Sequence, residues 1–65
     1  MKISINQVQH ELPATATLAD AVAVAQVQPP FAAAVNLQFV PKTHYQSKQL
    51  QANDRIDIIA PVTGG

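Results

Sequence analysis

The chain has 65 residues with four basic and four acidic side chains, no cysteine, and a composition that is 48% hydrophobic and 12% charged. One small domain of this length has little room for an enclosed active site, and without cysteine it has no disulfide, zinc-thiolate cluster or thiol nucleophile. The zero net charge argues against a nucleic-acid partner and the short apolar stretches argue against a membrane span, so we expect a cytoplasmic protein.

Two strands joined by a tight turn are predicted first. Residues 2–5 alternate polar and apolar side chains, which places Ile3 and Ile5 on one face. Residues 6–7 are the predicted turn, because asparagine tolerates the left-handed conformation, and residues 8–12 form the return strand.

One helix of useful length is predicted over residues 18–26. Thr17 is a good N-cap, and Asp20 can complete a capping box with it. The apolar residues at helical spacing are Leu18, Ala21, Val22 and Ala25. The two prolines at 29–30 exclude a longer helix.

A second hairpin is predicted after the prolines, with strands at residues 31–35 and 39–40 and a turn between them. Leu37 would be strained at a positive φ, so we expect this turn to differ from the type that asparagine-glycine favours. Residues 42–48 are predicted to form one helical turn or a surface loop, with Tyr45 in a solvated turn.

The last predicted strand covers residues 55–59. Its alternation places Ile56 and Ile58 toward the core, and Pro61 prevents further pairing. The order of elements predicts an α+β fold of the ubiquitin-like β-grasp type, in which a mixed sheet of about four to five strands packs on one main helix. The first and last strands would pair in parallel at its centre.

Both glycines of the chain are its last two residues, Gly64 and Gly65. Glycine normally serves turns and helix ends, so this placement indicates a different use. A slim Gly-Gly end can present its carboxylate inside a narrow channel of another protein. We therefore predict a single domain over residues 1–60 and a flexible tail over residues 61–65, with a frayed chain end as the alternative.

Several segments in this order carry a family resemblance: Met1-Lys2-Ile3-Ser4-Ile5-Asn6, Glu11-Leu12-Pro13, Thr17-Leu18-Ala19-Asp20, Phe39-Val40-Pro41-Lys42, Asn53-Asp54-Arg55-Ile56 and Ala60-Pro61-Val62-Thr63-Gly64-Gly65. Over its whole length the chain resembles the ThiS family, the sulfur carriers of thiamine biosynthesis. It departs from the family at the turns 6–7, 36–37 and 52–54, where glycine is common in the family.

The resemblance implies a carrier that performs no catalysis and binds no cofactor of its own. A ThiF-like adenylyltransferase of the ubiquitin-activating type would use ATP and magnesium to adenylate the Gly65 carboxylate. A sulfur donor, such as a cysteine desulfurase relay, would convert it to a thiocarboxylate, or 1-thioglycine. That group would give its sulfur to a ThiG-like thiazole synthase.

Recognition of the tail by both partner enzymes is expected to involve Pro61, Val62, Thr63 and Gly64. Phe39 and Ile59 form a candidate docking patch, although a core position is favoured for each. His10 and His44 lack a third ligand at metal spacing, so no metal site is expected.

Two alternative functions remain open. The small sulfur-carrier subunit of molybdopterin synthase shares the expected fold and the Gly-Gly end, although its chains tend to be longer. A ubiquitin-like modifier joined to lysines through Gly65, or a module that only docks through its sheet, belongs to another class. The short length and the segment at residues 39–42 favour the thiamine branch.

Overall fold

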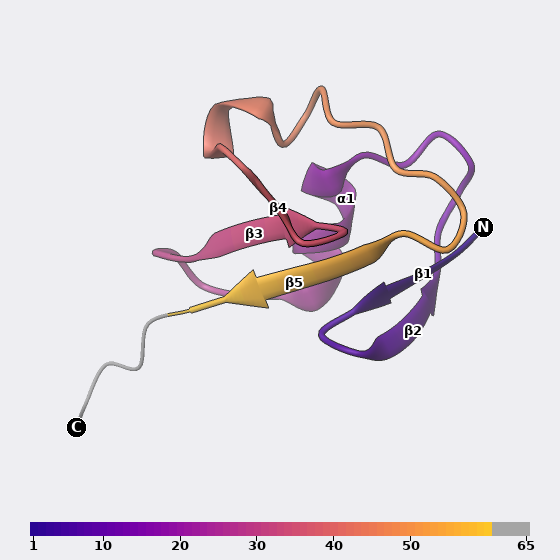
Figure 1. Ribbon diagram of the computed structural model, residues 1–65, viewed down its shortest axis with the longest axis horizontal. Coiled ribbons are helices and arrows are strands. Elements are labelled where there is room, and N and C mark those ends of the chain that lie inside the picture. Colours follow the sequence, from indigo (N-terminus) through magenta and orange to yellow (C-terminus); the bar gives the residue numbers. More distant parts are fainter. Residues whose placement is uncertain (61–65) are drawn as a thin grey trace.

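The computed structural model describes residues 1–60, which form a single sheet with one α-helix across it (Figure 1). In chain order the elements are β1 (Lys2–Ile5), β2 (Val8–Glu11), α1 (Leu18–Ala25), β3 (Ala32–Val35), β4 (Gln38–Val40), the 3-10 turn η1 (Lys42–His44) and β5 (Arg55–Ile59). The five strands lie in the order β2-β1-β5-β3-β4. The β1–β5 pair is parallel and the other pairs are antiparallel, which confirms the predicted parallel pair at the centre.

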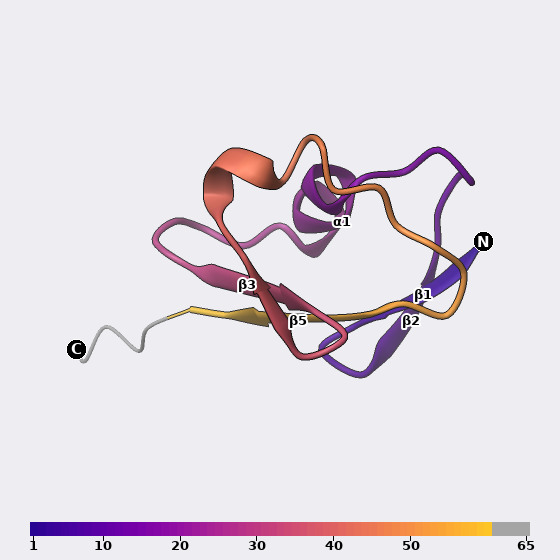
Figure 2. The same ribbon diagram turned by 45° about the horizontal axis from the view of Figure 1, so that its top comes forward.

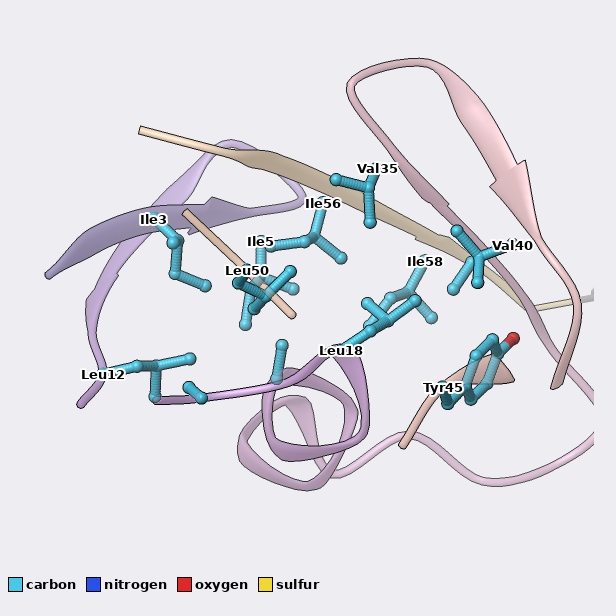
Figure 3. Packing of buried hydrophobic residues seen from close by; sticks show 13 residues of the cluster. Ile3, Ile5, Leu12, Leu18, Val35, Val40, Tyr45, Leu50, Ile56 and Ile58 are labelled. Carbon is cyan, nitrogen blue, oxygen red and sulfur yellow. The ribbon is translucent and has the colours of Figure 1, made fainter. Parts of the chain in front are cut away.

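The core lies between α1 and the face of the sheet that α1 covers (Figures 1 and 2). Leu18 on the helix and Ile56 on β5 are fully buried at 0% exposure, and the predicted inward position of Ile58 is also confirmed. Figure 3 shows these side chains filling the space between the two layers with residues from β1, β3 and β4. Central burial of β5 follows from its place between β1 and β3.

The helix begins as the sequence predicts. The Asp20 carboxylate accepts hydrogen bonds from the Thr17 backbone N–H at 2.9 Å and from its hydroxyl at 3.3 Å. This places a negative charge in the first turn, at the positive end of the helix dipole. At the other end Gln26 adopts the left-handed conformation with φ 56°, which stops the helix before the prolines.

The segment after β4 packs against the beginning of α1 and closes one end of the core. The Leu18 N–H donates to the Lys48 carbonyl at 2.9 Å, and the Leu50 N–H donates to the Ala16 carbonyl at 3.0 Å. Tyr45 is buried, with its ring stacked on Phe31 at a centroid distance of 6.0 Å. The expectation of a solvated turn at Tyr45 is therefore wrong, because its ring fills the space between η1 and the residues before β3.

Both hairpin turns have two consecutive residues with positive φ. Asn6 and Gln7 have φ of 50° and 70°, and Asn36 and Leu37 have φ of 51° and 68°. The prediction that Leu37 would avoid this conformation is wrong. Val35 pairs with Gln38, which leaves only two residues to reverse the chain. Two-residue turns between right-twisted strands favour the type I′ or II′ conformation, and the positive φ of both Asn36 and Leu37 is that of type I′.

Replacing Leu37 with glycine is expected to raise the free energy of unfolding by about 0.5–1 kcal/mol, since it relieves a left-handed strain of about 1–2 kcal/mol and adds a smaller unfolded-state entropy cost. Leu37 is 75% exposed, so its side chain contributes little burial. Chemical denaturation measures the change. Leu37→Ala is the matched control, because it keeps Cβ and its strain; an equal gain from alanine would contradict the argument.

Candidate functional site

The candidate site is the end of β5, from which the chain continues toward Gly65. β5 lies between β1 and β3, and its last residue, Ile59, pairs with Ala32 at the beginning of β3. Ala60 follows and is exposed. The predicted tail residues lie outside the described residues: Pro61, Val62, Thr63, Gly64 and Gly65. The structure therefore defines the base from which this tail starts.

The parallel pairing that supports β5 is short. It joins Ser4 to Arg55 and Ile5 to Ile56, and β1 then ends. Asn6 adds a hydrogen bond to β5 beyond the end of β1, because its side-chain Oδ1 accepts from the Ile58 N–H at 2.8 Å. The turn between β1 and β2 therefore supplies an acceptor for the Ile58 N–H, which lies beyond the reach of β1.

A second turn asparagine acts in the same way at the start of β5. The Asn36 Oδ1 accepts from the Arg55 N–H at 3.0 Å, and its Nδ2 donates to the Asp54 carboxylate at 3.0 Å. Both asparagines are in predicted turns, but their side-chain hydrogen bonds to β5 were not predicted. The available signal was that each of the two predicted turns begins with asparagine, whose side chain is short and has both an acceptor and a donor.

Phe39 and Ile59 lie on the face of the sheet opposite α1, where they are 68% and 66% exposed. The favoured core positions are therefore wrong for both residues. The strand register explains this, because Ala33 faces the core with Val40 and Ile58 as its partners. The alternate residues of β3 face outward, with Ala34 opposite Phe39 and Ala32 opposite Ile59. We call this set, Ala32, Ala34, Phe39 and Ile59, the apolar patch.

The apolar patch lies beside the end of β5, and polar residues border it on the same face. Arg55 and Asp57 form an ion pair there, with 3.1 Å between Nε and Oδ2. The pair is partly exposed, so it contributes little to stability. Exposed apolar side chains that lie together are a candidate surface for binding a partner.

The two histidines considered as metal ligands, His10 and His44, do not lie close together. His10 lies on β2 and His44 in η1, and these flank opposite edges of the sheet. Within residues 1–60 no group of three or more histidine, aspartate or glutamate side chains is arranged to hold a metal ion. Among the same residues, no helix combines the length and the apolar character that crossing a membrane requires.

A mixed sheet with parallel first and last strands at its centre, packed on one helix, defines a ubiquitin-like β-grasp fold. The chain belongs to the ThiS family, whose model matches residues 3–65. The crystal structure of the thiamine biosynthesis protein ThiS from Geobacter metallireducens is similar, with a TM-score of 0.80, 10% sequence identity and coverage of 100% of both chains. At that identity the likeness shows the fold alone.

No curated protein matches the chain. Family membership supports a role as a small sulfur carrier in thiamine biosynthesis, with partners that belong to that process.

Proposed function

We propose that this protein carries sulfur for the thiazole moiety of thiamine as a thiocarboxylate on Gly65. The observation that carries the proposal is the ThiS family match, which extends through Gly64 and Gly65. The fold agrees with it, because β5 leads directly from the centre of the sheet into the residues that precede this glycine pair.

The chemistry begins at the Gly65 carboxylate, which is ionised at neutral pH. Its negative charge repels nucleophiles and its oxygen is a poor leaving group. A ThiF-like adenylyltransferase uses ATP and magnesium to join the carboxylate to AMP, with release of pyrophosphate. A sulfur donor, such as a persulfide supplied by a cysteine desulfurase, then attacks the acyl carbon and AMP leaves. Reductive cleavage of the resulting acyl disulfide by a thiol gives the thiocarboxylate.

The protein acts in this scheme as a co-substrate. The thiocarboxylate sulfur is a better nucleophile than a carboxylate oxygen, and it is delivered to the active site of a ThiG-like thiazole synthase. The domain supplies a rigid base for the tail. Asn6 contributes to this base, because its side chain accepts a hydrogen bond from the Ile58 N–H near the end of β5. Residues Pro61, Val62, Thr63 and Gly64 give the tail its fit to the enzymes.

The apolar patch is the proposed docking surface for the activating enzyme. Phe39 and Ile59 are both exposed, and the strand register places them on the face that α1 leaves uncovered. Because Ile59 ends β5, a partner that contacts the patch is well placed to receive the residues that follow. All of these steps would take place in the cytoplasm.

Mass spectrometry of the intact protein tests the proposal. The purified chain is incubated with a ThiF-like enzyme, ATP, magnesium, a cysteine desulfurase, cysteine and a thiol reductant. We expect a mass increase equal to the exchange of one oxygen for one sulfur, and fragmentation should locate it at Gly65. A parallel reaction without ATP is the control and should show no increase.

Three results would contradict the proposal. The mass could stay unchanged with an adenylyltransferase that is shown to load another carrier. That result would exclude sulfur loading of this protein by the proposed route. An amide between Gly65 and a lysine would identify a protein modifier. Sulfur transfer to a molybdopterin precursor, with none to a thiazole synthase, would assign the protein to the molybdopterin branch.

A further inference from the structure

A groove of about 340 Å³ runs beside β4, which forms one edge of the sheet. Residues 38–41 line one side, and His44, Ser47 and Lys48 line the other. Figure 1 shows how the chain after β4 turns back through η1, which brings these two segments into one surface. β3 lies between this groove and β5, and the groove shares one residue, Phe39, with the apolar patch.

The backbone of Phe39 faces this groove. The two-residue turn makes Val35 and Gln38 the hydrogen-bonded closing pair, so the next pair, Ala34 and Phe39, is not hydrogen-bonded. The Asn36 N–H supports this assignment, because it donates to the Arg55 carbonyl at 2.7 Å and so points toward β5. The N–H and C=O of Phe39 therefore point away from β3, toward the open edge.

The ionisable side chains that line the groove are both basic. His44 and Lys48 are exposed, and within residues 1–60 neither forms an ion pair. The acidic residues lie elsewhere: Glu11 on β2, Asp20 on α1, Asp54 before β5 and Asp57 on β5. The groove therefore combines an unpaired strand edge, an exposed aromatic ring and positive charge.

The opposite edge of the sheet has a different character. There β2 carries Glu11, which lies 3.9 Å from the N-terminal amine and is paired in register with Lys2. A charged side chain on an edge strand discourages the pairing of another strand. β4 carries no charged side chain in its own residues, Gln38, Phe39 and Val40, and its protection is limited to its short length and the proline that follows it.

We propose that the β4 groove binds an extended segment of a partner protein that carries a carboxylate side chain. The segment pairs with the N–H and C=O of Phe39 as an added strand, its apolar residue packs on the Phe39 ring, and its carboxylate meets Lys48. A second copy of this chain fits less well, because a two-fold pairing of β4 edges would supply no carboxylate from the groove to offset Lys48. The proposal does not depend on the sulfur-carrier role.

Binding at this groove should be weak and sensitive to salt. β4 has three residues and Pro41 follows it, so the added strand gains few backbone hydrogen bonds. The charge pair that Lys48 would form is exposed, and salt screens it over about 10 Å at 0.1 M ionic strength, so binding should weaken further as the salt concentration rises.

Amide chemical shifts of the full-length protein test the proposal. The probe is a capped pentapeptide of alternating valine and glutamate, added at low salt up to about 5 mM, which would reveal a dissociation constant near about 1 mM. We expect the largest shifts at Phe39 and Lys48. Lys48→Glu should weaken binding by about tenfold or more. Lys2→Glu is the matched control, because Lys2 lies on β1, three strands away from β4, and this variant should bind as the unchanged protein does.

The proposal is overturned if the peptide causes no shifts at the highest concentration, or if the shifts lie on β2 or on Ile59 instead. It is also overturned if Lys48→Glu binds the peptide normally, or if a peptide with lysine in place of glutamate binds equally well. Concentration-dependent dimerisation that involves the β4 residues would assign the groove to a second copy. The spectrum of each free variant shows that its fold is retained.

Discussion

Deletion of Gly65 is expected to reduce sulfur loading by at least about 100-fold. The deletion moves the terminal carboxylate back by roughly 3.5 Å along an extended chain, and a misplacement of about 1 Å can already reduce a rate by about 100-fold. Folding should not change, because the core residues lie between Ile3 and Ile58. Intact mass after incubation with the activating enzyme measures loading, and thermal unfolding measures stability.

The matched control for this deletion is Gly65→Ala. It keeps the chain length and the carboxylate and adds one methyl group, so it should load more sulfur than the deleted chain and less than the unchanged protein. Sulfur loading by the deleted chain at the normal rate would contradict the assignment of Gly65 as the sulfur-carrying residue. A lower unfolding temperature after the deletion would show that the terminus supports the fold.

Ile59→Asp is expected to lower the rate of loading by about tenfold or more at subsaturating carrier concentration, since an unpaired charge in the centre of a docking surface costs about 2 kcal/mol or more of binding energy. Ile59 is 66% exposed, so the same change should affect unfolding only slightly. The dependence of the initial loading rate on carrier concentration measures the effect, which should appear mainly in KM.

Val8→Asp is the control for this second prediction. Val8 is 59% exposed and also lies on a strand, but on β2, away from the apolar patch. It introduces the same charge and should leave the loading rate unchanged. Equal loss of loading in both variants would point to a general effect of net charge, and no loss in Ile59→Asp would remove Ile59 from the docking surface.

Local patterns predicted the elements whose determinants lie close together in the sequence. Thr17 and Asp20 are three residues apart, and their capping interaction is present. The alternation around Ile56 and Ile58 predicted the inward face of β5. These features depend on periodicity and capping chemistry, which neighbouring residues determine.

Features set by distant segments were predicted less well. Phe39 faces outward because Ala34 is its partner on β3, and nothing within the short strand β4 fixes that register. Tyr45 is buried because Phe31, far from it in the sequence, stacks on its ring. Leu37 takes a positive φ because the pairing of Val35 with Gln38 leaves a two-residue turn. In each case tertiary contacts outweigh local preference.

The central position of β5 also determines how the domain responds to mechanical force. A force applied along the axis of β5 would act on a strand that is paired with β1 on one side and with β3 on the other. The hydrogen bonds of both pairings run across the strand, so they carry this load together in shear and do not unzip one after another. A force in that direction would therefore have to break both pairings at once in order to unravel the sheet.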